Sequence, residues 1–99
     1  MNRDITKLNK AFESRIRLGI MSVLVVNEKI EFSELKEMLE LTDGNLASHI
    51  AALEKLKYLE VTKQFIGKKP NTTYFATEEG RRAFSQHLDA LEALIKSHK

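Results

Sequence analysis

The chain has 99 residues, of which 42% are hydrophobic and 30% charged, the balance of an ordinary globular protein and not of a disordered one. It has no cysteine, which excludes disulfides, thiolate metal sites and cysteine nucleophiles. The net charge of +2 is too small to indicate a polyanionic partner by itself.

The N-terminal residues show no apolar segment typical of signal peptides, and no stretch is apolar for long enough to span a bilayer. We therefore expect a cytoplasmic protein without membrane contact.

Ile5, Leu8 and Phe12 recur at helical spacing, which predicts a short helix over about residues 4–11. The next segment is apolar on most sides, so a buried helix is predicted over about Ser14–Val26.

Residues 28–32 are too few for a helix and alternate in polarity, which predicts a connection or a very short strand. Ser33 then offers an N-cap for a second short helix that ends near Glu40. The inward face of this helix is expected to consist of Leu35, Met38 and Leu39.

Residues 41–44 predict a tight turn in which Thr42 or Asp43 caps the next helix. That helix has apolar residues at spacings of four, three and three, while its small polar residues point elsewhere. The predicted inward residues are Leu46, Ile50, Leu53 and Leu56. Two short helices joined by such a turn form the helix-turn-helix pattern.

From Leu59 the polarity alternates, which predicts a strand, and a second β-rich run follows at Thr72–Ala76. The residues between them, 67–71, predict a basic hairpin tip that contains glycine and proline. Between Lys55 and Lys69 there are five lysines and one acid, whereas acids gather at positions 28–40. This separation indicates a directed electrostatic surface.

Thr77 is predicted to cap a final helix with two acids in its first turn. Its apolar residues recur at spacings of four, three and four, as in a coiled-coil seam. This seam either folds back onto its own domain or forms a dimer, and its size favours the dimer. The expected interface consists of Ile5, Leu8, Phe12, Phe84, Leu88, Leu91, Leu94 and Ile95.

Four stretches together give the chain a likeness to one protein family that no single stretch gives. They are Phe32–Leu39, Leu41–Leu56, Phe65–Tyr74 and Thr77–Arg81. In their order and spacing the chain resembles winged helix-turn-helix regulators of the MarR and ArsR type. The likeness is closest to small stand-alone members that consist of little more than the DNA-binding domain and dimerising helices.

The resemblance implies an α+β, mostly α fold, with a three-helix core, a β-hairpin wing and dimerisation helices at both ends. It implies a single domain over residues 1–99, with the core at about 12–76 and the C-terminal dimerisation helix at about 77–98. In one place the chain departs from the family pattern. Lys57 stands where the family usually has a glycine, and a lysine at positive φ would be strained, so a turn built differently and a changed exit angle of the wing are expected.

The resemblance also implies a sequence-specific regulator that binds double-stranded DNA, expected to be a palindromic operator bound by a homodimer. The recognition helix, about 43–57, would lie in the major groove, and the wing, about 66–73, on the backbone or in the minor groove. Its base-reading candidates are Thr42, Asn45, Ser48 and His49. Its backbone-contact candidates are Lys55, Lys63, Lys68, Lys69, Thr72 and Thr73.

Several alternatives stay open at this stage. A winged helix can also serve as a protein-protein or RNA interaction module. A metal site at a dimer seam, built from His87, His98 and acids such as Asp89 or Glu92, is conceivable, although we expect neither metal nor cofactor. No enzyme motif is present, and the effector, if the protein has one, is unknown.

Overall fold

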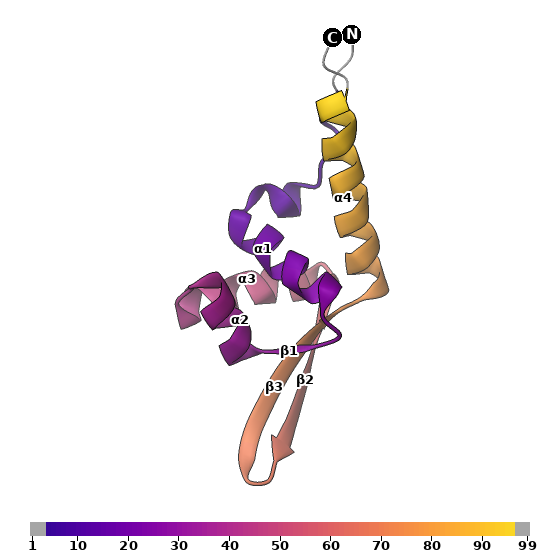
Figure 1. Ribbon diagram of the computed structural model, residues 1–99. Coiled ribbons are helices and arrows are strands. Elements are labelled where there is room, and N and C mark those ends of the chain that lie inside the picture. The colour runs from indigo at the N-terminus through magenta and orange to yellow at the C-terminus, as the bar shows by residue number, and fades with distance from the viewer. Residues whose placement is uncertain (1–3, 97–99) are drawn as a thin grey trace.

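The computed structural model describes residues 4–96 and has the predicted α+β architecture (Figure 1). Its elements are η1 (Lys10–Glu13), α1 (Arg15–Val26), β1 (Ile30–Glu31), α2 (Phe32–Leu39), α3 (Asp43–Lys55), β2 (Leu59–Ile66), β3 (Lys69–Ala76) and α4 (Glu78–Lys96). Within the described residues, no helix is long and apolar enough to cross a membrane.

The molecule is elongated, with extents of 60 × 25 × 21 Å. Helices α1, α2 and α3 form its body, and the β2–β3 hairpin and α4 project from this body at opposite ends (Figure 1). The three strands form an antiparallel sheet in the order β1-β3-β2. The short β1 therefore ties the hairpin to the segment between α1 and α2.

The core is built where the three helices meet the first residues of β2. Its largest fully buried side chains are Ile20, Met21, Leu24, Leu35, Leu46, Leu53 and Leu59. Two residues predicted to face inward do not reach this core, since Met38 is 56% exposed and Leu56 is 42% exposed. Leu56 follows the last residue of α3, where the chain already turns away from the helix.

Polar side chains cap three of the helices, and two of these caps, Thr42 and Thr77, were expected. Ser14 caps α1, Thr42 caps α3, and the Gly80 N–H donates to Thr77 Oγ1 at the start of α4. Helix α2 differs, because its N-cap is Glu31 and not Ser33. Glu31 and Glu34 form a reciprocal capping box, which satisfies two free N–H groups at once.

The predicted N-terminal helix is absent from the described residues. Asn9 caps a single 3-10 turn, η1, and the residues before it form a turn. Ile5 is 66% exposed, so the first turn of the expected helix has no packing partner, whereas Phe12 at its other end is buried. A short helix without tertiary packing does not recover the free energy of nucleation, which explains the difference.

The hairpin is longer and its turn tighter than predicted. Strand pairing continues to Ile66 opposite Lys69, so the turn itself is only Gly67 and Lys68. Gly67 has a φ of +66°, the conformation that glycine adopts without steric cost. Lys69 and Pro70 therefore belong to β3 and not to a loop.

A closely packed corner joins the end of α3 to the start of α4. Lys57 has a φ of 66°, so the chain keeps the left-handed turn in spite of the lysine, whereas a differently built turn was expected. Thr77 bonds to both residues of this turn: its Oγ1 donates to the Lys57 carbonyl and its N–H donates to the Tyr58 carbonyl. Gly80 packs directly on the Tyr58 carbonyl, where a Cβ would come within 2.0 Å of the oxygen.

Candidate functional site

The outer side of α3 is polar and open to solvent. Thr42, Asn45 and Ser48 are exposed, as a base-reading role requires. Thr42 also has a local role, because its Oγ1 accepts a hydrogen bond from the Asn45 N–H at 3.2 Å. Within residues 4–96, neither α4 nor the segment before α1 covers these side chains.

His49 differs from the other three candidates, because it is half-buried and has a partner in α1. The Arg17 Nε–H donates to His49 Nδ1 at 3.1 Å. An arginine can only donate, so the neutral imidazole must carry its proton on Nε2. Sequence reasoning missed Arg17, since nothing in the local pattern links positions 32 residues apart.

Charges at the start of α3 are balanced between two helices. The carboxylate of Asp43, in the first turn of α3, pairs with the Lys36 ammonium of α2 at 2.8 Å. Both side chains are largely exposed, so the pair contributes at most about 1 kcal/mol to stability. Its electrostatic effect matters more here, because Lys36 offsets a negative charge beside the polar side of α3.

The hairpin presents a cationic surface, as predicted. Lys55, Lys63, Lys68 and Lys69 are exposed and Thr72 is half-buried. Thr73 is different, since its side chain is only 6% exposed between Glu31 of β1 and Thr62 of β2. Because Thr73 lies on the central strand of the sheet, it cannot offer its hydroxyl to a ligand at the surface.

Two contacts position the hairpin against the helices. The Asn71 amide donates to the Glu31 carboxylate at 2.9 Å, which links β3 to the residue that caps α2. Tyr74 packs at the base of the hairpin with 7% of its surface exposed, against Phe32. Burial raises the pKa of Tyr74, and the nearby Glu54 carboxylate raises it further, so this phenol stays neutral and structural.

Comparison with known proteins places this arrangement in a family. The winged helix DNA-binding domain family matches residues 16–95. The chain belongs to this winged helix family. In it, the helix-turn-helix pair corresponds to α2 and α3, and the β2–β3 hairpin is the wing.

Relatives and solved structures agree with this assignment. An uncharacterised protein of Methanocaldococcus jannaschii is 38% identical over 88 residues, which cover 89% of this chain and 96% of the relative. A structure described as a transcriptional regulator homologue from Pyrococcus horikoshii matches with a TM-score of 0.77 and 34% identity, over 93% of this chain and 96% of that one.

A third match shows the fold alone. The PcaV transcriptional regulator from Streptomyces coelicolor, solved with its natural ligand, has a TM-score of 0.75 but only 13% identity. The alignment covers 92% of this chain and 63% of PcaV. The expected likeness to winged-helix transcription regulators is thus confirmed.

Helix α4 of this winged helix has two apolar faces, where the sequence indicated one seam. The inner face packs on the body and consists of Gly80, Phe84, His87 and Ala90. Phe12 fits between this face and Tyr58, with ring centroids 5.7 Å from Phe84 and 5.8 Å from Tyr58. Phe12 and Phe84 are 4% and 8% exposed, so they belong to the core and not, as expected, to a dimer surface.

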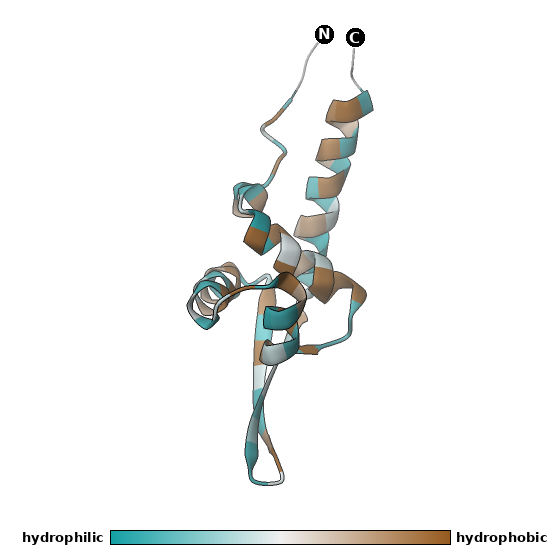
Figure 2. Cartoon of the chain, turned by 60° about the vertical axis from the view of Figure 1, so that its left-hand side comes forward, coloured by the Kyte–Doolittle hydropathy of each residue, from teal (hydrophilic) through white to brown (hydrophobic). Residues whose placement is uncertain are grey.

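The outer face of α4 carries apolar side chains that the chain itself does not cover. Leu88, Leu91 and Ile95 are 46%, 37% and 73% exposed. Their spacing of three and four places them on one stripe, and apolar bands recur along the whole helix in Figure 2. Leu8 and Leu94 are half-buried, and Ile5 is exposed at the same end of the molecule.

His87, considered from sequence as a metal ligand, has structural contacts within the chain. Its Nδ1 accepts a hydrogen bond from the Asn9 N–H at 3.0 Å, and its ring packs edge-on against Phe12. Within residues 4–96, no group of three or more His, Asp or Glu side chains could hold a metal ion. His98 lies outside the described residues.

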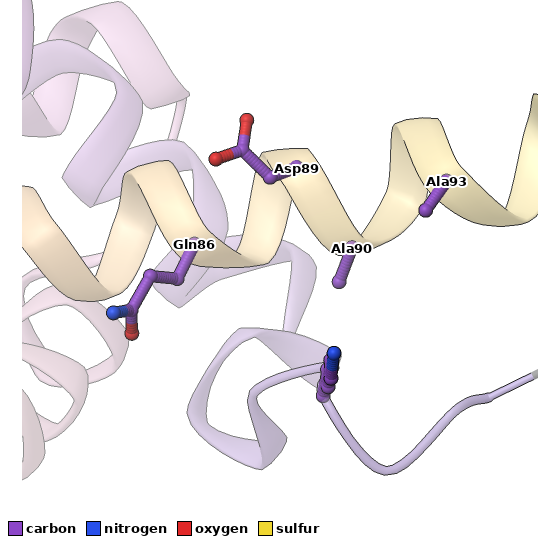
Figure 3. A pocket seen from close by; sticks show the side chains of 5 residues that line it. Gln86, Asp89, Ala90 and Ala93 are labelled. Carbon is purple, nitrogen blue, oxygen red and sulfur yellow. The ribbon is translucent and has the colours of Figure 1, made fainter.

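A hollow of about 490 Å³ lies between α4 and the N-terminal segment (Figure 3). It is lined by Lys7, Gln86, Asp89, Ala90 and Ala93. None of its polar side chains has a hydrogen bond or ion pair in the described part of the chain, so the hollow is open and lined by solvated groups. It lies at the α4 end of the molecule, far from the wing.

Proposed function

We propose that this winged-helix protein is a sequence-specific regulator of transcription that binds double-stranded DNA as a homodimer. One observation carries the proposal: α3 keeps its polar outer side open to solvent, and the neighbouring wing has three lysines and no acid over residues 61–76. The body, α1 to β3, would be the DNA-binding unit, and α4 would be the dimerising helix.

Base reading is assigned to the exposed side chains near the start of α3. Asn45 can pair with adenine through two hydrogen bonds, and Ser48 can bond to bases or to phosphates. His49 has only its Nε2–H to offer, because Nδ1 is occupied by Arg17. It would therefore select bases that present an acceptor in the major groove, such as guanine.

Backbone contacts are assigned to the lysines of the wing and to Lys55. An ammonium group neutralises phosphate without demanding a fixed geometry, so these contacts would strengthen binding on any sequence. Free N–H groups at the start of α3 favour a further phosphate. Affinity and sequence preference thus depend on different parts of the surface, which makes them separable by mutation.

The homodimer is proposed to form through the outer stripe of α4. Leu88, Leu91 and Ile95 would pack against the same residues of a second copy, as a two-fold contact requires. With two recognition helices related by this symmetry, the preferred sites would be palindromic, with half-sites about 34–36 Å apart.

The first test is selection of bound duplexes from a random pool, followed by titration at several salt concentrations. The wild-type chain should bind with a steep salt dependence. The variant K68A/K69A should flatten the slope of log affinity against log salt by about 0.9 for each phosphate that is no longer neutralised. K7A/K10A, which removes two exposed lysines from the N-terminal segment, serves as the charge-matched control and should change the slope little.

Sequence preference provides the second readout. Asn45→Ala should relax preference at one or two positions of the selected site without altering the salt slope. Arg17→Ala should relax the position read by His49, because the freed imidazole can present either tautomer. Uniform weakening on every sequence would contradict the reading role of both residues, and no duplex binding by the wild-type chain would favour a protein-interaction module.

Oligomeric state is measured by light scattering during size-exclusion chromatography. L88E/I95E should convert the dimer to a folded monomer, because two carboxylates on one stripe repel their symmetry mates. V26E, at a residue 78% exposed on α1, is the matched control and should leave the dimer intact. A monomeric wild-type chain would overturn this part of the proposal.

A further inference from the structure

The end of the wing carries two large apolar side chains that the fold does not use. Phe65 is 74% exposed and Ile66 is 60% exposed. Consecutive strand residues point to opposite faces, so the tip is apolar on both sides of the hairpin. Phe65 also lies directly opposite Pro70 in the strand register, which enlarges the apolar surface on its face.

These side chains contribute nothing to the core. Burial along β2 is complete at Leu59 and partial at Val61, and every later residue of the strand is exposed. A Cβ added to Gly67 would meet no atom within 4 Å, so the turn itself stands free. Single exposed apolar residues are common, but two neighbours at the end of a projecting hairpin form a surface suited to contact.

The charges around the tip indicate which partner fits. Lys63, Lys68 and Lys69 surround the two apolar side chains, and residues 61–76 contain no acid. A DNA minor groove has matching chemistry, with sugars and base edges between two rows of phosphates. The groove is only about 6 Å wide, so the side chains of the tip, and not the hairpin as a whole, can enter it.

We propose that the wing tip inserts Phe65 and Ile66 into the minor groove beside the site read by α3, as an apolar wedge held by the flanking lysines. This inference rests on the proposed DNA-binding function and deepens it. Apolar wedges of this kind partly unstack a base step and bend the duplex. The wing would then distort DNA as well as neutralise its phosphates.

The test uses the full chain and a duplex obtained from the random-pool selection, with 2-aminopurine placed in turn at each adenine that flanks the major-groove site. The fluorescence of this base rises when it unstacks. Wild-type protein should raise it at one flanking step, and end-to-end energy transfer should report a bend. The variant F65A/I66A should abolish both signals at saturating protein and weaken binding about tenfold, with the salt slope unchanged.

Two controls separate the wedge from other effects. K68A/K69A should flatten the salt slope but keep the 2-aminopurine signal once the duplex is saturated. V26A removes an apolar side chain that is 78% exposed at the end of α1, outside the wing, and it should behave as wild type. All three variants alter exposed residues, and circular dichroism with thermal unfolding checks that each one folds.

The possible failures can be told apart. If F65A/I66A binds and unstacks the duplex as wild type does, the wedge is wrong while DNA binding stands, and the apolar tip becomes a contact for a protein partner. If the wild-type chain binds the duplex without raising 2-aminopurine fluorescence at any flanking step, the wedge is also wrong. If the wild-type chain binds no duplex, the proposed function fails and the wedge fails with it.

Discussion

Lys57 and Gly67, two of the three described residues with a left-handed backbone, have opposite surroundings; the third, Glu40, ends α2. Lys57, at the corner between α3 and β2, has a φ of 66°, and Gly67, at the wing turn, has a φ of +66°. This left-handed conformation costs a residue with a side chain about 1–2 kcal/mol and costs glycine almost nothing. Glycine at the wing turn fits this preference, whereas lysine at the corner does not.

Their neighbours explain the difference. At the corner, the Lys57 N–H donates to the Glu54 carbonyl at 2.9 Å and its carbonyl accepts from the Thr77 hydroxyl at 2.6 Å. Around Gly67, no atom lies within 4 Å of the place where a Cβ would stand. A packed corner can therefore hold a strained residue, while a free turn needs a residue for which the conformation is not strained.

The largest expected effect comes from Gly80, where the corner is tightest. Gly80→Ala should lower the free energy of unfolding by about 3 kcal/mol, because its Cβ would overlap the Tyr58 backbone and α4 would have to move. Denaturant unfolding followed by circular dichroism measures this. Gly44→Ala is the matched control, since a Cβ there meets nothing within 4 Å, and it should leave stability unchanged or slightly higher. Equal effects at the two glycines would contradict the packing argument.

A smaller loss is expected at Thr77, which both caps α4 and holds the Lys57 carbonyl. Thr77→Ala should cost about 1–2 kcal/mol of unfolding free energy, because the Gly80 N–H loses its acceptor and the strained turn loses its donor. Thr77→Ser keeps the hydroxyl and should restore most of this loss. If Thr77→Ser is as unstable as Thr77→Ala, the hydroxyl is not the stabilising group.

At the wing turn the effect should be local. Gly67→Ala should raise the free energy of the native turn by about 1–2 kcal/mol. Because the tip packs on nothing, we expect faster amide hydrogen exchange in residues 63–72, and little change in the melting temperature of the body. A fall in melting temperature as large as that of Gly80→Ala would show that the wing is part of the cooperative core.

The smallest effect should have the opposite sign. Lys57→Gly should stabilise the chain by about 0.5–1 kcal/mol, because it removes the strain of the left-handed lysine and loses part of that gain to the greater freedom of glycine in the unfolded state. Thermal unfolding measures the difference. Loss of stability would mean that the Lys57 side chain contributes more than its backbone conformation costs.

Local sequence patterns predicted most elements of this protein. The buried helix from Ser14, the tight turn before α3, the alternating strands and the Thr77 cap depend on periodicity and on hydrogen bonds between near neighbours. Lys57 is an exception, because the strain of a lysine at positive φ favoured a different turn, and the chain keeps the left-handed one. The exposure of Asn45 and Ser48 was predictable too, since the spacing of the apolar residues of α3 determines which side faces the core.

The tertiary structure alone decided which apolar and polar side chains remain available. Phe12 and Phe84 meet inside one chain, Thr73 lies on the central strand, and Arg17 reaches His49 across two helices. Each outcome depends on residues far apart in the sequence, and periodicity gives the face of an element but not its neighbour. Gly80 is a further example. That this position must lack a side chain is evident only in the folded structure, where the Tyr58 carbonyl packs against it.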